Sequence, residues 1–312
     1  MTTGKPIRLR DFIEDEDGWL YAVSAYDNDE RVGCILRYIP HPEGERSDQA
    51  GRRYRKLDFD EAYALISEKK PDYCRLIHRV PRDEIRKVLK PEDEIRQAMS
   101  RDPRVRNIAG LLMLRKGEYG CTGSRLCGLE DASSDIDLVI YGEHWQEASR
   151  RLEELVGEGL LEEITDAMWL RIYEKRRPSI PFQEFILHEK RKWNRGQIGG
   201  TYFDLLYTRP YTDIETRAAV KGKVLGRQFI RAEVINADRA FDHPAVYTVR
   251  HEEISRVISF THTYAGQARA GEVLEASGVC EENNGERWLV VGTSREAPGE
   301  YIRSVSLLEK HR

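Results

Sequence analysis

Two aspartates interrupt a segment that otherwise has the pattern of a buried strand. In "SDIDLVI" (residues 134–140), the two-residue period of a strand places Asp135 and Asp137 on one face and the aliphatic side chains on the other. Their Cα atoms would then lie about 6.7 Å apart, so both carboxylates can reach one divalent cation. Without a cation the two like charges would repel each other. The spacing therefore predicts a metal site.

A glycine–serine pair stands a short distance before this strand. Gly123 and Ser124 begin "GSRLCGLE", a pattern that indicates a tight turn leading into a short helix, with Ser124 at or near the N-cap. Backbone N–H groups, a hydroxyl and a helix dipole together favour an anion, and phosphate is the natural one. Glycine lets the backbone approach the phosphate closely. We expect Arg125, beside the turn, to contact the phosphate as well.

A third carboxylate comes from a later strand. In "TYFDLLY" (residues 201–207), Asp204 faces away from the apolar side chains on either side of it. If this strand lies beside the first, the three carboxylates could hold two Mg²⁺ ions about 3.5–4 Å apart. Glu184 in "PFQEFIL" has the same apolar–acid–apolar pattern. We favour Asp204.

This combination resembles the polymerase-β-type nucleotidyltransferase superfamily, which has a Gly-Ser pair, a gap, Asp-x-Asp on a strand and a lone Asp on a later strand. The form "GSRLCGLEDASSDIDLVIYG" is most similar to the minimal, short-gap members and to uncharacterised archaeal predicted nucleotidyltransferases. The resemblance through the motifs covers residues 105–210. It implies an α/β (α+β) catalytic core built on a mixed sheet.

The resemblance also implies a role for each residue. Gly123 and Ser124 would hold the β and γ phosphates of an NTP, and Asp135 and Asp137 would bind both Mg²⁺ ions, with Mn²⁺ as a substitute. Asp204 would bind the catalytic ion and help to deprotonate an acceptor hydroxyl. Paired metals neutralise charge during in-line phosphoryl transfer. The expected reaction transfers NMP from an NTP, ATP by default, to a hydroxyl of RNA or protein, with release of pyrophosphate.

Other functions remain open at this point. The longer motif forms of polymerases and tRNA CCA-adding enzymes are absent, which favours transfer of a single nucleotide. A catalytically silent nucleotide-sensing or RNA-binding module should lack the full carboxylate set, whereas all three candidates are present. A toxin–antitoxin-type minimal nucleotidyltransferase would depend on a neighbouring gene.

A basic segment, residues 175–195, precedes the third aspartate. Its cations are Lys175, Arg176, Arg177, Lys190, Arg191, Lys192 and Arg195. We expect a solvated run of charges; the alternative is that part of it faces the triphosphate or a polynucleotide, with Trp193 available for stacking. His251 and His262 lack a second ligand at metal-binding spacing, so we expect satisfied or exposed histidines.

The sequence predicts three domains. Residues 1–88 predict a small α/β domain, with a hairpin over 19–39, a charged loop over 41–56 and a helix from about Asp58. Residues 89–222 predict the catalytic domain, with a helix from Pro91 to Asp102 and another that ends at Gly157. The apolar run from Val105 favours a buried helix, with a strand as the alternative. Short strand-like runs over 223–312 predict a small β-barrel, of which the OB-fold is one form.

Bulk composition excludes several classes of protein. The 312 residues include 40% hydrophobic and 33% charged residues, which is typical of a globular chain. A net charge of −4 argues against a protein that coats nucleic acid. Five cysteines without CxxC spacing indicate reduced thiols rather than disulfides or zinc. No apolar run is long enough to span a membrane and no signal peptide begins the chain, so we expect a cytoplasmic protein without a membrane partner.

Overall fold

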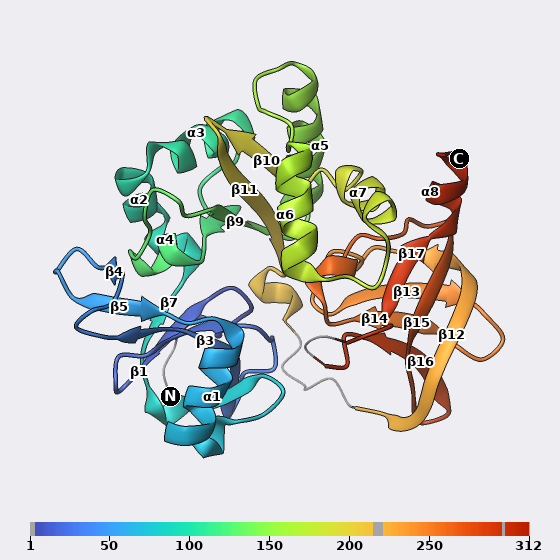
Figure 1. Ribbon diagram of the computed structural model, residues 1–312, viewed down its shortest axis with the longest axis horizontal. Coiled ribbons are helices and arrows are strands. Elements are labelled where there is room, and N and C mark those ends of the chain that lie inside the picture. Colours follow the sequence, from blue (N-terminus) through green and yellow to red (C-terminus); the bar gives the residue numbers. More distant parts are fainter. Residues whose placement is uncertain (1–3, 215–220, 295–296, 312) are drawn as a thin grey trace. The chain divides into compact units, whose positions relative to one another are not determined.

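The computed structural model describes residues 4–214, 221–294 and 297–311 (Figure 1). The chain divides into two compact units: residues 1–163 with 194–218 form the first unit, and residues 164–193 with 219–312 form the second. Within the described residues there are eight α-helices and three sheets. This confirms a mixed α+β fold. The three sheets draw on residues 12–89, 119–208 and 223–304 in turn.

The first sheet has seven antiparallel strands, and six of them follow one path. Their order is β4 (Arg46–Ser47), β5 (Arg53–Lys56), β3 (Arg31–Pro40), β2 (Leu20–Val23), β1 (Phe12–Asp15) and β7 (Ile85–Leu89), with β6 (His78–Pro81) paired to β3. The predicted hairpin is confirmed as β2 and β3. The predicted charged loop over 41–56 is wrong in part, because β4 and β5 form a hairpin there. Their side chains are mostly charged and partly exposed, so they lack the apolar alternation that marks a strand.

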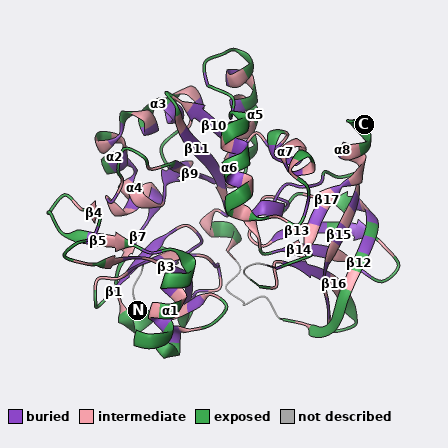
Figure 2. Ribbon diagram, viewed as in Figure 1, coloured by how far each residue is buried: buried purple, intermediate pink, exposed green. Residues whose placement is uncertain are grey.

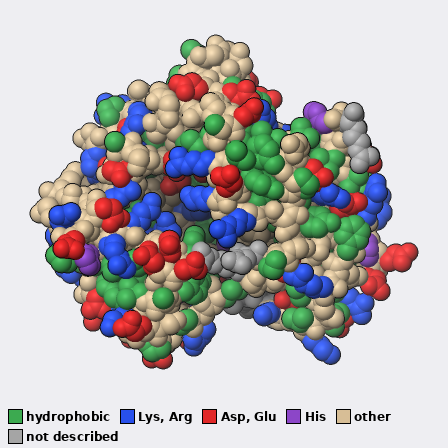
Figure 3. All heavy atoms as spheres, viewed as in Figure 1, with side chains coloured by type: hydrophobic (Ala, Val, Ile, Leu, Met, Phe, Trp, Pro, Cys, Tyr) green, Lys and Arg blue, Asp and Glu red, His purple; other side chains and the backbone are tan. Residues whose placement is uncertain are grey.

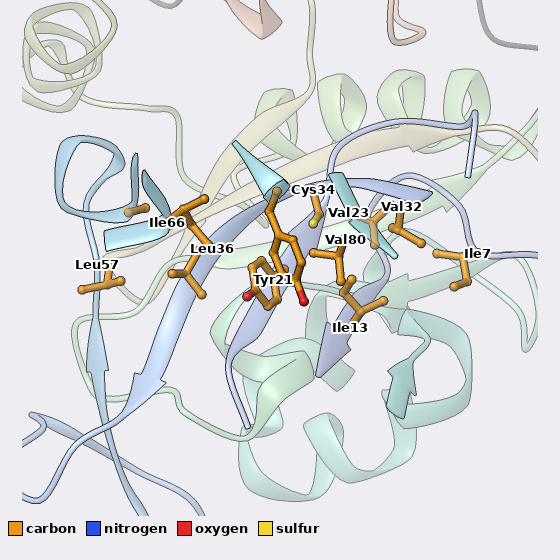
Figure 4. Close-up of a cluster of buried hydrophobic side chains, with 12 residues drawn as sticks. Ile7, Ile13, Tyr21, Val23, Val32, Cys34, Leu36, Leu57, Ile66 and Val80 are labelled. Carbon is orange, nitrogen blue, oxygen red and sulfur yellow. The ribbon is translucent and has the colours of Figure 1, made fainter. Parts of the chain in front are cut away.

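Each face of this sheet is covered by a different part of the chain. Helix α1 (Phe59–Lys69) begins at Asp58 with a capping box to Glu61 and covers one face. Figure 4 shows Tyr21, Leu36 and Ile66 in the core between them. The opposite face buries a second cluster that includes Leu126 and Leu129, which come from and just after α4 (Ser124–Cys127). The N-terminal sheet therefore packs against the short helix that follows the glycine–serine turn.

The second sheet is mixed and has four strands. Its order is β10 (Arg195–Ile198), β11 (Thr201–Thr208), β9 (Ile136–Tyr141) and β8 (Tyr119–Cys121). Strands β9 and β11 are parallel, and the two outer pairs are antiparallel. Both parallel strands are buried along most of their length (Figure 2).

Helices pack around the second sheet as their apolar patterns predict. Helix α5 (His144–Gly157) ends at the predicted glycine and packs on β9 and β11, where the Trp145 indole donates to the Leu205 carbonyl at 3.3 Å. Helix α2 (Pro91–Arg101) packs on β8, and α3 (Pro103–Leu111) follows it after Asp102. The apolar face of the central strands is thus covered by α5, and the aspartates of these strands face the other way.

The second unit combines three described helices with the third sheet. Helices α6 (Asp166–Arg176) and α7 (Phe182–Lys190) belong to this unit, as does α8 (Val305–Lys310). The sheet order is β12 (Lys223–Asn236), β13 (Ala245–Arg250), β14 (Arg256–Ser259), β16 (Glu286–Val291), β15 (Val273–Asn283) and β17 (Tyr301–Ser304). Strand β12 pairs with β15 as well, and β14 and β16 are parallel. Short 3₁₀ turns complete the chain at Pro71–Tyr73, Arg82–Glu84, Tyr211–Asp213 and His262–Tyr264.

Candidate functional site

The parallel pairing of β9 and β11 brings two of the predicted carboxylates together. Asp137 and Asp204 are Cα partners in this register. In-register neighbours on parallel strands project their side chains from the same face, so both carboxylates lie on the face opposite α5. Asp137 is half-buried, and Asp204 is 9% exposed. The two strands are neighbours, which is the condition that the sequence analysis set for a shared cluster of carboxylates.

Electrostatics show that the two carboxylates interact strongly. Burial, followed by the charge of Asp204, raises the pKa of Asp137 to about 7. Asp135 adds to this increase in pKa, whereas the positive charges of Arg10 and Arg125 oppose it. The charged form of the Asp137 carboxylate is therefore disfavoured near neutral pH, and an additional cation beside it would favour that form. A divalent ion with oxygen ligands is such a cation.

Gly123 lies directly against Asp137. A Cβ on residue 123 would come within 2.6 Å of Asp137 Oδ2, and Gly123 has φ +70°, which favours glycine in any case. The Thr122 N–H also donates to the Asp137 carbonyl at 2.9 Å. The turn and the carboxylate pair therefore form one continuous site.

Ser124 lies next to the N-cap of α4, which agrees with the prediction that it is at or near this position. Gly123 is the N-cap of α4, and Ser124 is the first helical residue. Ser124 is half-buried, and its hydroxyl makes no hydrogen bond to any part of the chain that the structure describes. The hydroxyl thus remains available to a ligand. Helix α4 has only four residues, so its dipole is small and the backbone N–H groups matter more.

Arg125 does not face the turn, contrary to our expectation of a phosphate contact. Its guanidinium is 1% exposed and donates to Asp102 Oδ2 from Nη2 at 2.7 Å and from Nε at 3.0 Å. It also donates to the carbonyls of Ser134 and Asp135. Arg125 therefore fixes the chain as it enters β9. The first turn of α4 points this side chain into the interior, away from the ligand side.

Asp135 lies just before β9 begins and is exposed. Its charge raises the pKa of Asp137, so it contributes to the negative electrostatic potential at the site. Over residues 4–214, 221–294 and 297–311, no three His, Cys, Asp or Glu side chains are arranged as a ready-made metal-binding group. Asp137 and Asp204 form the assembled part of the predicted cluster, and Asp135 stands at its edge.

Arg195 is the residue of the basic segment that reaches this site. It pairs in register with Asp204, and its Nε donates to Asp204 Oδ1 at 2.8 Å. Other cations of the segment form ion pairs within the second unit: Arg176 and Lys192 with Glu189, and Arg191 with Glu272. The expectation of a solvated run is wrong for these residues, because carboxylates that are distant in sequence or on the next helical turn neutralise them.

The remaining predicted alternatives are placed elsewhere. Glu184 lies on helix α7, not on a strand, and pairs with Arg303 at 2.9 Å in the second unit. The His251 ring nitrogen accepts the backbone N–H groups of Glu253 and Ile254, which agrees with a satisfied histidine. All five cysteines are free thiols, as expected. Charged side chains of both signs are interspersed over the face shown in Figure 3.

Sequence reasoning missed Arg10. This residue lies in a turn before β1, and its backbone carbonyl accepts the Thr122 hydroxyl at 2.7 Å. Its charge interacts with both Asp137 and Asp204. Arg10 is more than 100 residues from either aspartate, and no local motif marks it. Tertiary packing alone brings it to the site.

The fold and the site define an α+β protein in which a carboxylate pair on a mixed sheet faces a glycine turn. The chain belongs to the same family as the "Uncharacterized protein MJ1086" of Methanocaldococcus jannaschii, with 34% identity over 336 aligned residues. The match covers 95% of this chain and 98% of that relative, whose name assigns no activity. No family model matches the chain, and no solved structure matches it significantly.

None of the described helices is both long enough and apolar enough to cross a bilayer.

Proposed function

We propose that this protein is a Mg²⁺-dependent nucleotidyltransferase that transfers NMP from an NTP to a hydroxyl and releases pyrophosphate. The observation that carries the proposal is the register of Asp137 with Asp204 on parallel strands, with Gly123 in contact with the Asp137 carboxylate. A mixed sheet with this arrangement agrees with the catalytic core of the polymerase-β-type superfamily. ATP is the default donor.

The donor set fits a hard divalent cation. Carboxylate oxygens are the ligands that Mg²⁺ and Mn²⁺ prefer, and the raised pKa of Asp137 indicates that a cation would favour the charged form of this carboxylate. Asp137 and Asp204 would hold the ions, with Asp135 completing the set from the strand entrance. When bound, the ions neutralise charge on the transferring phosphoryl group.

The chain's own residues supply binding and proton transfer. The backbone at Gly123 and the Ser124 hydroxyl bind phosphate oxygens of the NTP, because both lie beside the carboxylate pair and the hydroxyl has no partner within the described residues. Asp204 accepts the proton of the acceptor hydroxyl. Arg195, which donates to Asp204 at 2.8 Å, orients that carboxylate.

The second unit favours RNA over protein as the acceptor. Its strand pairings run from β12 through β13, β14, β16 and β15 and back to β12. We interpret this ring as a small five-stranded barrel of the OB type, an architecture that often binds oligonucleotides. A silent module is less favoured, because Asp135, Asp137 and Asp204 are all retained. We propose that the protein acts in the cytoplasm.

Transfer of labelled nucleotide tests the proposal. Purified protein is incubated with each α-³²P-NTP, with Mg²⁺ or Mn²⁺, and with total RNA or with cell lysate depleted of RNA. The wild type should label one of the two acceptor pools in a metal-dependent reaction, and Asp137→Asn and Asp204→Asn should not. Asp83→Asn, an exposed aspartate remote from β9 and β11 in sequence, is the matched control and should label like the wild type. Equal labelling by all four proteins would overturn the proposal.

A further inference from the structure

Arg10 has a backbone conformation that an arginine seldom adopts. It is the third residue of the turn Arg8–Asp11, in which the Asp11 N–H donates to the Arg8 carbonyl at 3.1 Å, and its φ is +76°. A positive φ at this position of a turn favours glycine or asparagine. An L-residue with a long side chain costs folding free energy there.

The turn is held firmly on both sides of Arg10. The Arg8 guanidinium lies 4.0 Å from the Tyr141 ring centroid and 3.7 Å from that of Tyr211, and it pairs with Glu92 at 3.2 Å. Asp11 pairs with Lys90 at 2.7 Å. These contacts place Arg8 and Asp11 in ion pairs that hold the turn in position. They leave Arg10 as the residue that the turn presents to the site.

Hydrogen bonds connect the Arg10 backbone to the site itself. Its N–H donates to the Val23 carbonyl at 3.0 Å, and its carbonyl accepts the Thr122 hydroxyl at 2.7 Å. The Thr122 N–H in turn donates to the Asp137 carbonyl at 2.9 Å. One residue, Thr122, thus links the N-terminal turn to the carboxylate strand and immediately precedes Gly123. Arg10 is therefore fixed relative to the phosphate turn.

The Arg10 side chain has unused donors. Its Nε is buried without a hydrogen-bond partner, and among the described residues its guanidinium makes neither an ion pair nor a hydrogen bond. By contrast, Arg125 is bonded to Asp102 and Arg195 to Asp204. Arg10 interacts with Asp137 and Asp204 only by longer-range electrostatic attraction, without a direct hydrogen bond. A guanidinium has five N–H donors in a planar fork that matches phosphate oxygens.

We propose that Arg10 binds a phosphate of the incoming nucleotide's triphosphate, so that the N-terminal turn completes the nucleotide site. This inference rests on the proposed function, because the nucleotide must lie between the Gly123 turn and the carboxylate pair. A triphosphate there meets hydrogen-bond donors on two sides: the backbone and hydroxyl of Gly123–Ser124 and the fork of Arg10. The strained backbone is retained because glycine in its place would supply no donor.

Binding of the Mn²⁺ complex of inorganic tripolyphosphate tests this role without catalysis and without a choice of base. Isothermal titration calorimetry is applied to the wild type, Arg10→Gly, Arg10→Gln and Asp137→Asn. Loss of a charged hydrogen-bonding group should weaken binding by about 10- to 100-fold in both Arg10 variants. Binding of Mn²⁺ alone should be unchanged or tighter in these variants, because a cation near the carboxylates has been removed. A merely structural role for Arg10 would not weaken tripolyphosphate binding while Mn²⁺ binding is kept or strengthened.

Two control variants separate the effect of removing a positive charge from the effect of relieving a strained backbone. Arg86→Ala removes an exposed arginine of β7, and Met113→Gly relieves a positive φ of +57° at an exposed residue; both should bind tripolyphosphate like the wild type. Arg10→Gly should melt at the wild-type temperature or higher, because it removes the strain. Arg10→Gln keeps the strain and provides the affinity measurement if the glycine variant unfolds.

The outcomes distinguish failure of the proposed role of Arg10 from failure of the proposed function. If the wild type binds the complex, Asp137→Asn does not, and both Arg10 variants bind like the wild type, then the role of Arg10 is overturned and the proposed function stands. If the wild type does not bind, or Asp137→Asn binds equally well, both are overturned. A 10- to 100-fold loss confined to the Arg10 and Asp137 variants supports the role.

Discussion

Gly123 and Asp137 are in such close contact that a methyl group on residue 123 would lie 2.6 Å from Asp137 Oδ2. This contact joins the two halves of the candidate site. It explains why glycine occupies position 123, since both the positive φ and the proximity of the carboxylate exclude other residues. The candidate site depends on this contact and on the pairing of Asp137 with Asp204 on the adjacent strand.

Gly123→Ala should reduce both stability and activity. The added Cβ forces Asp137 to move and places alanine at φ +70°, which together should lower the free energy of unfolding by about 1–3 kcal/mol. Nucleotide transfer should fall by at least tenfold, because the carboxylate leaves its position. Urea unfolding and the labelling assay measure the two effects.

Gly159→Ala provides the matched control for this change. Gly159 has φ +71°, but nothing lies within 4 Å of a Cβ built there. The variant should therefore show the cost of the backbone conformation without the steric effect, and its activity should equal that of the wild type. Equal losses of activity in the two alanine variants would contradict the assigned contact between residues 123 and 137.

Asp137→Asn should change how stability depends on pH when metal is absent. The pKa of Asp137 is raised from 3.8 to about 7, so the folded protein retains a proton that the unfolded chain has already lost. Stability of the wild type should therefore fall as pH rises from about 4 to about 7. Above pH 7 the asparagine variant should be more stable by about 2–4 kcal/mol, and the difference should shrink toward pH 4. Urea titrations in EDTA across this range measure it, and parallel pH profiles for the two proteins would refute the raised pKa.

Divalent cations should stabilise the wild type through the same carboxylates. At a concentration of Mn²⁺ about 100 times the dissociation constant, binding should add about 2.7 kcal/mol to the free energy of unfolding. The increase in melting temperature should be larger at pH 8 than at pH 5, because ionised carboxylates bind the metal. Asp137→Asn and Asp204→Asn should abolish the increase, whereas Asp83→Asn should preserve it. A full increase in the first two variants would place the metal elsewhere.

Arg125→Met should destabilise the fold rather than affect ligand binding directly. The variant leaves Asp102 paired with Arg104 alone and leaves the carbonyls of Ser134 and Asp135 without their donor, which should cost about 1–3 kcal/mol. Arg106→Met, on the exposed surface of α3, should cost little and serves as the control. If Arg125→Met kept wild-type stability and lost only tripolyphosphate binding, the original expectation of a phosphate contact would be restored.

Local patterns were sufficient for much of the scaffold and for the central pair of carboxylates. Helices α2 and α5 begin and end near residues with helix-capping or helix-breaking properties, Pro91 and Gly157 among them. The alternation around Asp137 and Asp204 predicted two strands with one acidic face each. The sequence left open whether the two strands are neighbours, and the structure pairs them in parallel with Asp137 opposite Asp204.

The errors share a physical origin in tertiary contacts. The direction of the Arg125 side chain depends on its buried contacts with Asp102 and with the Ser134 carbonyl, which a local sequence pattern does not show. Glu184 has the same short apolar–acid–apolar pattern in a helix as in a strand. The pairing of Arg176 and Lys192 with Glu189, and the approach of Arg10 to Asp137, arise only when distant segments pack.

The central claim is that Asp137 and Asp204 hold divalent metal beside a triphosphate bound at Gly123–Ser124. A crystal structure of the protein with Mn²⁺ and α,β-methylene-ATP, collected with anomalous scattering, tests it most directly. The account predicts an anomalous peak in contact with both carboxylates and phosphate density at the Gly123 turn and the Arg10 guanidinium. Manganese or triphosphate bound at a different place, with the Asp137–Asp204 pair left without metal, would contradict the account.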